Sequence, residues 1–336
     1  MSEIIFFSSP IGLGHITRDI AIAQSLDNQI RFVGGEGGPK LLAEYGFEAQ
    51  NLYKPPIFDT QNGTLRNPLR WLLKYYSYYK KCKAISSNII EKEKPKLIVS
   101  DEDFASLTVA QEKKLKTVLI TDILETNFAR GVGSFIEKKM NKSMKVIMKR
   151  CDVIIMPEDG PDEDNIVRVG PIVRKTPYSR EELRKRLSFD RRTIIVSIGG
   201  TSAGQFLIDK TIQVFKKLNL DADMLIVSGP ALKISDGNIR NLGFVHNLHE
   251  IIYAADLIIS LAGKSTIDEA KSYGTPGIFI PIQGHFEQEE NAKNAGFSFK
   301  DLDRLESLIP AKINEKRDPK MFDGAQKAAN IIKKFL

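Results

Sequence analysis

The sequence has very few cysteines and no long apolar run. Only Cys82 and Cys151 occur among 336 residues, and neither belongs to a CxxC pair. Two isolated cysteines exclude a disulfide-stapled fold and a cysteine-based metal centre, and they fit a reducing compartment. No apolar stretch approaches the roughly 20 residues of a membrane-spanning helix, and Ile4–Phe7 is too short for a signal-peptide core. We therefore expect a cytoplasmic protein, either soluble or peripheral at the inner face of the cell membrane.

Two glycine-containing loops resemble nucleotide-binding motifs, but each lacks a required residue. The first contains Gly12 and Gly14, whereas the dinucleotide motif GxGxxG needs a third glycine where this chain has Thr17. The second, Gly263–Ser265, contains the GK[ST] of a P-loop, but Ile258 occupies the position of that motif's first glycine. These departures argue against a dinucleotide-dependent enzyme and against an ATPase.

The composition is that of a globular protein with a surplus of basic residues. Hydrophobic residues make up 42% and charged residues 27% of the chain, which argues against large-scale disorder, and the length predicts two domains. The formal net charge of +7 leaves three classes of partner: nucleic acid, an anionic membrane face and acidic small substrates. No helix-turn-helix, zinc-finger or RNP-type motif accompanies this charge, so nucleic acid is the weakest of the three.

The basic residues concentrate in two segments, Arg66–Lys94 and Lys138–Arg150. In the first segment they are interleaved with Trp71 and with tyrosines. Aromatic and basic residues together favour an anionic membrane surface, at roughly 1 kcal/mol per basic residue. A helix that is buried on one side and carries solvated lysines on the other explains the segment equally well.

Strands and helices alternate along both halves of the chain. Each half begins with an apolar strand, a glycine loop and a helix, with the strand at Ile4–Ser8 in the first half and at Thr193–Ile198 in the second. This alternation predicts βαβ units and parallel sheets. We expect an α/β protein with two Rossmann-like domains whose parallel sheets face a central cleft. The other expected strands are Ile30–Val33, Leu97–Ser100, Thr117–Ile120, Val153–Met156, Met224–Val227, Leu257–Ser260 and Gly277–Ile280.

A proline-rich segment at 159–178 separates the two halves. Prolines and glycines at this density break regular elements and mark linkers. We therefore expect an N-terminal domain at 1–158 and a C-terminal nucleotide-binding domain at 179–318. The amphipathic pattern of 319–336 predicts a final helix that packs back on the N-terminal domain.

Candidate reactive residues follow two strands of the first half. His15 lies at the turn into the first helix, and an imidazole can accept a proton from an attacking hydroxyl; a histidine that only caps the helix is the alternative. Asp101 and Asp103 follow another strand, so either could orient the histidine, and Asp103 can also cap the next helix. Arg18 either binds a phosphate or pairs with Asp19.

The second half carries polar residues at helix starts and in one loop. Backbone amides and hydroxyls at a helix N-terminus favour a diphosphate or a sugar. A carboxylate at Glu269 can accept both ribose hydroxyls of a nucleotide, although a glutamate that favours the helix dipole is the alternative. Gln283 and Gln288 offer donors and acceptors to sugar hydroxyls. The helix-start residues are Gly200, Thr201 and Ser202 in one loop and Gly263, Lys264, Ser265 and Thr266 in the other.

The stretch Asn241–Ala292 joins a buried strand, a glycine loop, a helix start, a second buried strand and a polar loop. In this order it resembles the donor-binding half of the GT-B glycosyltransferases of family 28, the MurG-like type. The first loop, GLGHITRD at 12–19, is similar to an uncharacterised archaeal and bacterial branch, where the family usually shows GGTGGH. The resemblance implies a base at His15 and donor contacts from Arg174, Phe244, Val245, Thr266, Glu269, Gln283 and Gln288. We also expect acceptor-side contacts from Gly12 and Arg18 and a donor contact from Gly14.

The resemblance also implies a reaction. An inverting, metal-independent enzyme would move a sugar, with GlcNAc as one candidate, from a UDP-sugar co-substrate to a hydroxyl or phosphate acceptor, and a lipid-linked acceptor bound by the N-terminal domain is one candidate. The Asp101-x-Asp103 spacing is typical of metal-dependent single-domain glycosyltransferases, but those enzymes lack two matched halves. The alternatives are a UDP-sugar hydrolase of the pseudaminic-acid-pathway type and a nucleotide-sugar-binding protein without catalysis. The donor sugar, the acceptor and the oligomeric state stay open.

Overall fold

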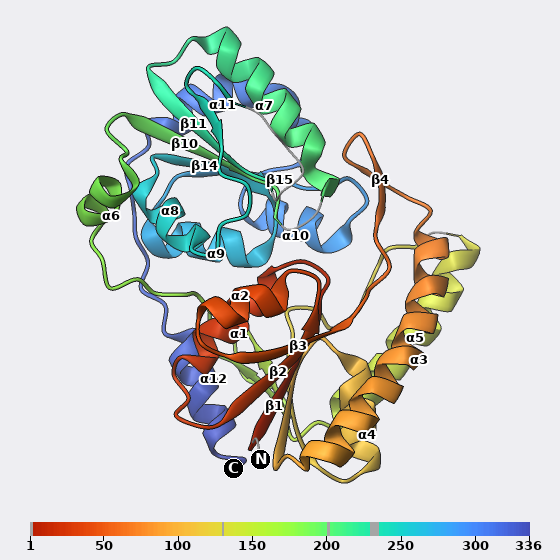
Figure 1. Ribbon diagram of the computed structural model, residues 1–336. Helices are drawn as coiled ribbons and strands as arrows, with labels where there is room; N and C mark the ends of the chain where they lie inside the picture. The colour runs from red at the N-terminus through yellow and green to blue at the C-terminus, as the bar shows by residue number, and fades with distance from the viewer. Residues whose placement is uncertain (1–2, 130, 200–201, 229–234) are drawn as a thin grey trace. The chain divides into compact units, whose positions relative to one another are not determined.

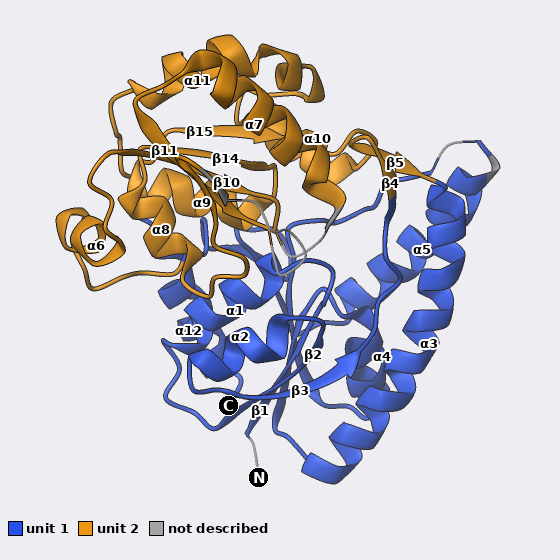
Figure 2. Cartoon of the chain, turned by 45° about the horizontal axis from the view of Figure 1, so that its top comes forward, with its two compact units in different colours: residues 1–59, 67–173, 322–336 blue, residues 60–66, 174–321 orange. Residues whose placement is uncertain are grey.

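The structure is a computed structural model that describes residues 3–129, 131–199, 202–228 and 235–336. Contacts divide the chain into two compact units, each built around its own sheet (Figure 2). Unit 1 consists of Met1–Asp59, Asn67–Val173 and Phe322–Leu336, and unit 2 of Thr60–Arg66 and Arg174–Met321. The chain therefore enters unit 2 twice, once through a short segment of the first half and once through the second half.

Unit 1 contains a seven-stranded parallel sheet with the order β3-β2-β1-β6-β7-β8-β9. Its inner strand β1 is buried at every position, which suits a parallel strand covered on both faces. Because β1 pairs with β6 from Ile4 opposite Leu97 to Ser8 opposite Asp101, these two strands end side by side. The strands are β1 (Ile4–Ser8), β2 (Ile30–Gly35), β3 (Glu48–Tyr53), β6 (Leu97–Asp101), β7 (Lys116–Ile120), β8 (Val153–Met156) and β9 (Ile166–Arg168).

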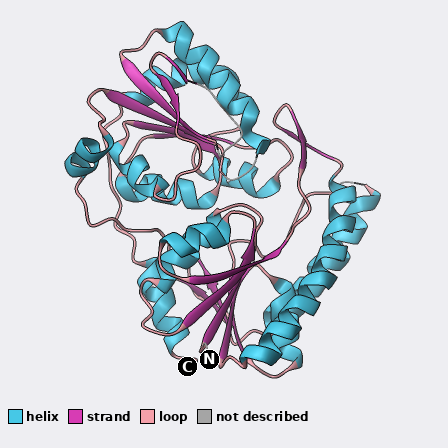
Figure 3. Ribbon diagram, viewed as in Figure 1, coloured by secondary structure: helices cyan, strands magenta, loops and turns pink. Residues whose placement is uncertain are grey.

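Helices flank this sheet, as Figures 1 and 3 show. The long helix α3 packs on α4 and α5, and the C-terminal helix α12 packs on α1. Ala328, Ala329 and Ile332 of α12 are buried, so its apolar side faces the rest of unit 1. The helices are α1 (Gly14–Ala23), α2 (Gly38–Glu44), α3 (Pro68–Glu93), α4 (Phe104–Glu112), α5 (Val132–Lys149) and α12 (Gly324–Lys333).

Unit 2 contains a six-stranded sheet with the order β12-β13-β11-β10-β14-β15. All its pairs are parallel except that of the edge strand β12 with β13. Its strands are β10 (Arg192–Ser197), β11 (Ala222–Val227), β12 (Ser235–Asp236), β13 (Ile239–Asn241), β14 (Leu257–Leu261) and β15 (Gly277–Ile280). Its helices are α6 (Arg180–Leu187), α7 (Gln205–Leu218), α8 (Leu248–Ala254), α9 (Lys264–Tyr273), α10 (Phe286–Asn294) and α11 (Leu305–Ile313), with 3-10 turns η1 (Ser202–Gly204) and η2 (Phe299–Arg304).

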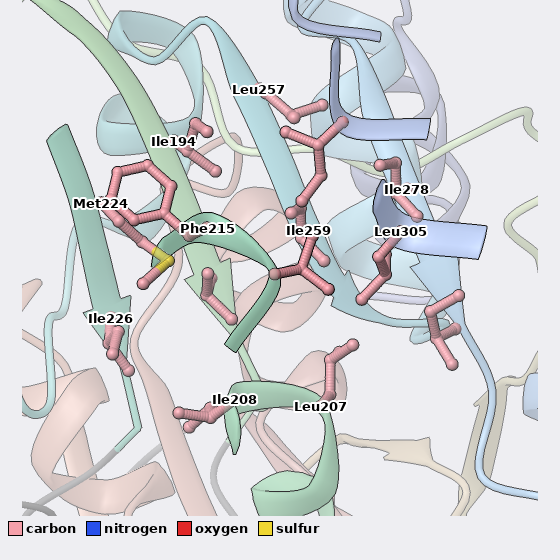
Figure 4. Packing of buried hydrophobic residues seen from close by; sticks show 14 of the residues in the cluster. Ile194, Leu207, Ile208, Phe215, Met224, Ile226, Leu257, Ile259, Ile278 and Leu305 are labelled. Atoms are coloured by element: carbon pink, nitrogen blue, oxygen red, sulfur yellow. The ribbon is translucent and has the colours of Figure 1, made fainter. Parts of the chain in front are cut away.

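Apolar side chains between the sheet and two helices form one core of unit 2 (Figure 4). Ile194 and Ile259 come from neighbouring strands, Phe215 from α7 and Leu305 from α11. Full burial of a side chain of this size contributes about 1.5–3 kcal/mol, so this layer holds the strands that carry the candidate site.

The expected fold class is confirmed: the chain is α/β with two parallel-sheet domains, and its last helix returns to the first of them. The sequence did not predict β3, the hairpin strands β4 (Asp59–Gln61) and β5 (Thr64–Arg66), β9, or the short strands β12 and β13. Strand β9 lies inside 159–178 and pairs with β8, so part of this proline-rich segment joins the sheet of unit 1. The expected domain boundaries stay a prediction. Within the described residues, no helix is both long and apolar enough to span a membrane.

Candidate active site

His15 lies in the first turn of α1, directly after the glycine loop that follows β1. The loop residue Gly12 has φ +87°, a left-handed conformation that favours glycine, and no atom lies within 4 Å of the position that a Cβ would take there. The His15 side chain is 15% exposed, and its Nδ1 lies 2.8 Å from Oδ1 of Asp101. The ring is therefore paired with a carboxylate, and the N-cap of α1 is Leu13 and not His15.

Asp101 is the fully buried last residue of β6, and Arg18 binds both of its oxygens. Arg18 Nε donates to Oδ2 at 2.6 Å and Nη2 to Oδ1 at 2.5 Å, while the guanidinium is only 4% exposed. The sequence left Arg18 either to bind a phosphate or to pair with Asp19. In the structure Arg18 pairs with Asp101, whereas Asp19 accepts a hydrogen bond from Ser8. Arg18 therefore fixes the carboxylate that in turn fixes His15.

Asp103 has different partners from Asp101. Its Oδ2 accepts from the backbone N–H of Ser106 at 3.1 Å, as an N-cap of α4, and from Tyr53 Oη at 2.9 Å. The capping role expected for Asp103 is therefore present. Of the two carboxylates that could have oriented His15, the structure brings Asp101 to it.

Two further carboxylates belong to this cluster: Glu102, which lies in the acidic stretch that follows β6, and Asp122, which was not predicted as a site residue. Glu102 Oε2 lies 3.8 Å from His15 Nε2, and its Oε1 accepts from Thr121 Oγ1 at 3.0 Å. Glu102 has φ +55°, which a non-glycine residue adopts only under constraint from its surroundings. Asp122 lies 3.3 Å from Arg18. Their positions in the sequence could have indicated that they lie near His15, because both residues follow adjacent strands of one parallel sheet.

In unit 2, the N-terminus of α9 presents small and hydroxyl-bearing residues. Gly263 is the N-cap, and no atom lies within 4 Å of the position that a Cβ would take there. Ser265 and Thr266 are half-buried in the first turn, whereas Lys264 Nζ is paired with Asp268 at 2.7 Å. The N–H groups of a first helical turn have no acceptor within the helix, and together with the positive end of the helix dipole they make this end of α9 suited to an anion.

Arg174 and Glu269 form a buried ion pair inside unit 2. Arg174 Nε donates to Glu269 Oε1 at 2.9 Å and Nη1 donates to the His246 carbonyl at 2.9 Å, with both side chains at most 4% exposed. Tyr273 Oη also donates to the Arg174 carbonyl. Arg174 was expected at the donor phosphates, but its guanidinium here contacts Glu269, the residue expected at the ribose.

The remaining predicted donor residues lie in loops of unit 2. Phe244 and Val245 are half-buried between β13 and α8. Gln283 follows β15 and is exposed, while Gln288 Oε1 accepts from the Ile282 N–H at 3.0 Å. Gly200 and Thr201 lie outside the described residues. Ser202 begins η1, and only its backbone is described.

Comparison with known proteins decides the family. The profile of the glycosyltransferase family 28 C-terminal domain matches residues 194–334. An uncharacterized glycosyltransferase of Methanopyrus kandleri is 26% identical over 217 residues, covering 61% of this chain and 62% of that protein. A UDP-N-acetylglucosamine–N-acetylmuramyl-(pentapeptide) pyrophosphoryl-undecaprenol N-acetylglucosamine transferase of Caldicellulosiruptor saccharolyticus is 24% identical over 322 residues, covering 87% of this chain and 81% of that protein. Residues 194–334 therefore form the C-terminal domain of a family 28 glycosyltransferase, and the chain as a whole is similar to the MurG-like type.

Solved structures agree on the fold of this glycosyltransferase. MurG of Acinetobacter baumannii superimposes with a TM-score of 0.58 at 15% sequence identity, covering 99% of this chain and 100% of that protein. A structural match at such low sequence identity shows only a shared fold, here the GT-B fold. The match to the Methanopyrus relative spans less than two thirds of that protein's length. The substrates of the glycosyltransferase are therefore a matter for proposal.

The carboxylates around His15 could also attract a cation. The ligand atoms of His15, Asp101 and Glu102 lie within 4.8 Å of one another. However, Arg18 already donates to both oxygens of Asp101 and brings positive charge to this position. A metal ion would have to replace these hydrogen bonds, so we assign no metal to this cluster of the glycosyltransferase.

The charges around His15 control its protonation. Burial lowers the pKa of His15, but the nearby Asp101 and Glu102 raise it more strongly, so the pKa reaches about 9. Burial likewise opposes ionisation of Asp101, but Arg18 and His15 outweigh it and hold the pKa of that carboxyl at about 2. At neutral pH the resting glycosyltransferase therefore contains mainly an imidazolium–carboxylate pair.

This raised pKa predicts a pH-dependent contribution of His15 to stability. Because the folded pKa of about 9 exceeds the 6.5 of a histidine in the unfolded chain, the protonated ring stabilises the folded state fully below about pH 6.5. The contribution is lost as the pH rises through 9. The melting temperature of wild type minus that of His15→Gln should therefore be largest near pH 6 and shrink towards pH 10. His246→Gln, at an exposed histidine, is the matched control, and a constant difference for His15→Gln would contradict the assignment.

Proposed function

We propose that this glycosyltransferase moves a sugar from a UDP-sugar to a hydroxyl or phosphate acceptor, with inversion, without a metal ion and with His15 as the general base. The observation that carries the proposal is the 2.8 Å contact between His15 Nδ1 and Asp101. GlcNAc is the first donor sugar to test, because the name of the Caldicellulosiruptor relative specifies UDP-N-acetylglucosamine.

The His15–Asp101 pair supports the assignment of the base. A carboxylate that binds Nδ1–H leaves Nε2 as the nitrogen that accepts a proton, and it stabilises the imidazolium that forms. A hydroxyl activated by one base attacks the anomeric carbon directly, and a single displacement inverts its configuration. With a pKa of about 9, roughly one ring in a hundred is neutral at pH 7. The rate should therefore rise about tenfold per pH unit towards pH 9.

The N-terminus of α9 supports a metal-independent departure of UDP. Backbone N–H groups and the hydroxyls of Ser265 and Thr266 can hold the diphosphate, whose charge increases as the glycosidic bond breaks. Glu269 would accept the ribose hydroxyls, with Arg174 holding its carboxylate in place. The backbone at Val245 would contact uracil.

A ligand panel tests the proposal most directly. UDP and UDP-sugars should raise the melting temperature more than TDP, GDP or their sugars, since a ligand that binds only the folded state stabilises it. Incubation with UDP-sugar alone separates the transferase from the hydrolase, because rapid release of UDP without an acceptor favours hydrolysis. If no nucleotide shifted the melting temperature, the proposed donor class would be wrong.

Replacing Glu269 by glutamine should weaken UDP binding about 5- to 150-fold, which corresponds to about 1–3 kcal/mol for hydrogen bonds to a charged group. Glutamine keeps an oxygen that can accept from Arg174 and so preserves the buried contact. Titration calorimetry should also compare 2′,3′-dideoxy-UDP, which lacks both ribose hydroxyls and should bind the two proteins equally. Equal weakening of both ligands would remove the ribose contact from the proposal.

We also propose that helices α3 and α5 bind an anionic membrane that carries a lipid-linked acceptor. Four apolar side chains on these helices are exposed: Leu73 and Tyr76 at 57%, Val146 at 53% and Phe135 at 77%. The two helices pack on each other, and both also carry exposed basic residues. Apolar and basic side chains together suit the boundary between lipid headgroups and acyl chains. The exposed basic residues are Arg70, Lys74, Lys80, Lys81, Lys138, Lys139, Lys142, Lys145 and Lys149.

Charge reversal on α5 should abolish this membrane binding. The triple variant Lys138→Glu, Lys139→Glu and Lys142→Glu should bind phosphatidylglycerol-containing vesicles at least about a hundredfold more weakly, at roughly 1 kcal/mol per lysine. Co-sedimentation with these vesicles measures the effect. The matched control reverses Lys185, Lys293 and Lys300, which are exposed on unit 2. Equal loss in both triple variants would indicate net charge alone and would contradict a site on α3 and α5.

A further inference from the structure

The β4–β5 hairpin is a part of the first half of the sequence that packs within unit 2. Residues 60–66 belong to unit 2, although the segments before and after them belong to unit 1. The hairpin contacts the loop that follows β15, where Gln283 lies. Neither the expected fold nor the proposed reaction gives this hairpin a role.

Three hydrogen bonds join the hairpin to Gln283. The Gln283 N–H donates to the Gly63 carbonyl at 2.7 Å, and the Leu65 N–H donates to the Gln283 carbonyl at 2.8 Å. Thr64 Oγ1 donates to the Gln283 side-chain oxygen Oε1 at 3.1 Å. Both backbone polar groups of Gln283 and one end of its amide are therefore held by the hairpin.

Packing fixes the hairpin in this position. Gly63 has φ +75°, and a Cβ there would lie 2.8 Å from the Phe299 ring and 2.9 Å from the Phe206 ring. Only glycine fits such a backbone conformation and such a close approach. Leu65, next to Thr64, packs against the apolar core of unit 2. The hairpin is thus anchored on both sides of Thr64.

We propose that the hairpin forms part of the donor-sugar subsite and that Thr64 positions Gln283 for it. Because Thr64 donates to Oε1, the Nε2 group, with its two N–H donors, is the end of the amide that would donate to the sugar. The subsite then selects a hexose with an acceptor oxygen at this position, such as a hydroxyl or the carbonyl of an N-acetyl group. This inference rests on the proposed function, since it takes Gln283 as a donor-sugar contact.

The test compares the affinities of UDP and of UDP-GlcNAc in variants of Thr64. Thr64→Val keeps the shape of the side chain but removes the donor. It should weaken UDP-GlcNAc binding about fivefold, in line with the loss of one hydrogen bond, and leave UDP binding unchanged. Thr64→Ser restores the hydroxyl and should restore the affinity. Thr60→Val, on the same hairpin, is the matched control and should bind both ligands like wild type.

Each outcome decides a different question. If wild type binds UDP but Thr64→Val binds UDP-GlcNAc as wild type does, the inference is overturned while the proposed function stands. Equal weakening of UDP and UDP-GlcNAc would overturn it too, because the effect would then not concern the sugar. If wild type binds neither ligand, the proposed function fails. Amide hydrogen exchange at Gln283, slow in wild type and faster in Gly63→Ala, tests the docking of the hairpin independently of any ligand; equally fast exchange in wild type would overturn it.

Discussion

Replacing His15 by alanine should lower kcat/KM about 10²- to 10⁴-fold, the range typical of the loss of a general base. The side chain is paired with Asp101 through Nδ1, so its removal takes away the proton acceptor and leaves the donor residues of unit 2 unchanged. The affinity for UDP should therefore stay the same. Steady-state kinetics with a matched acceptor and calorimetry with UDP measure the two effects separately.

The pH profile provides the control for this result. In wild type, kcat/KM should rise with pH and level off near pH 9, as His15 loses its proton. This acid limb of the profile should be absent from His15→Ala. Asp101→Asn should move the limb to lower pH, because the charge of Asp101 contributes most to raising the pKa of His15. Added imidazole should recover part of the activity of His15→Ala. Turnover by His15→Ala equal to that of wild type would refute the assignment of the base.

Replacing Asp101 by asparagine should lower the free energy of unfolding by about 3–5 kcal/mol, the usual cost of removing one partner of a buried ion pair. Arg18 is 4% exposed and donates to both oxygens of Asp101, so an amide there cannot satisfy two donors and carries no charge. The same change should lower the pKa of His15 by removing its closest carboxylate. Urea unfolding followed by fluorescence measures the stability.

A surface aspartate of the same unit serves as the control for Asp101→Asn. Asp27 is 98% exposed and pairs only loosely with Lys333, at 3.5 Å, so Asp27→Asn should leave the urea midpoint unchanged. The urea midpoint of Asp103→Asn should lie between those of Asp101→Asn and Asp27→Asn, because Asp103 caps α4 and accepts a hydrogen bond from Tyr53. If Asp101→Asn unfolded at the same urea concentration as wild type, the buried network around Arg18 would not hold the site together.

Much of the fold could be predicted because parallel strands are apolar along their whole length. Ile4–Ser8 and Gly277–Ile280 were predicted with the bounds that the structure has. Strands that are exposed on one side or very short, such as β3 and β9, gave no such signal. The hairpin strands β4 and β5 are three residues each, and their partner at Gln283 lies 219 positions from Thr64.

The candidate site was predictable in its location but not in its contacts. Parallel strands place their following loops at one edge of a sheet, which is why His15 and Asp101 could both be selected. The sequence left Asp101 and Asp103 as equal alternatives, and it placed Arg174 at the phosphates. In the structure Asp103 caps a helix and Arg174 pairs with Glu269, because the direction of each side chain depends on neighbours that are distant in the chain.

The sequence by itself determined the α/β class, the two parallel sheets and the glycine loops at the helix starts, since these follow from local hydrophobic periodicity and turn chemistry. The family also follows from it, through the pattern of 241–292. Only the tertiary structure decided that Asp101 holds His15, that Arg18 holds Asp101 and that the hairpin at 60–66 holds Gln283. These contacts join residues far apart in the chain, and packing, which no local pattern encodes, selects the partner of each buried polar group.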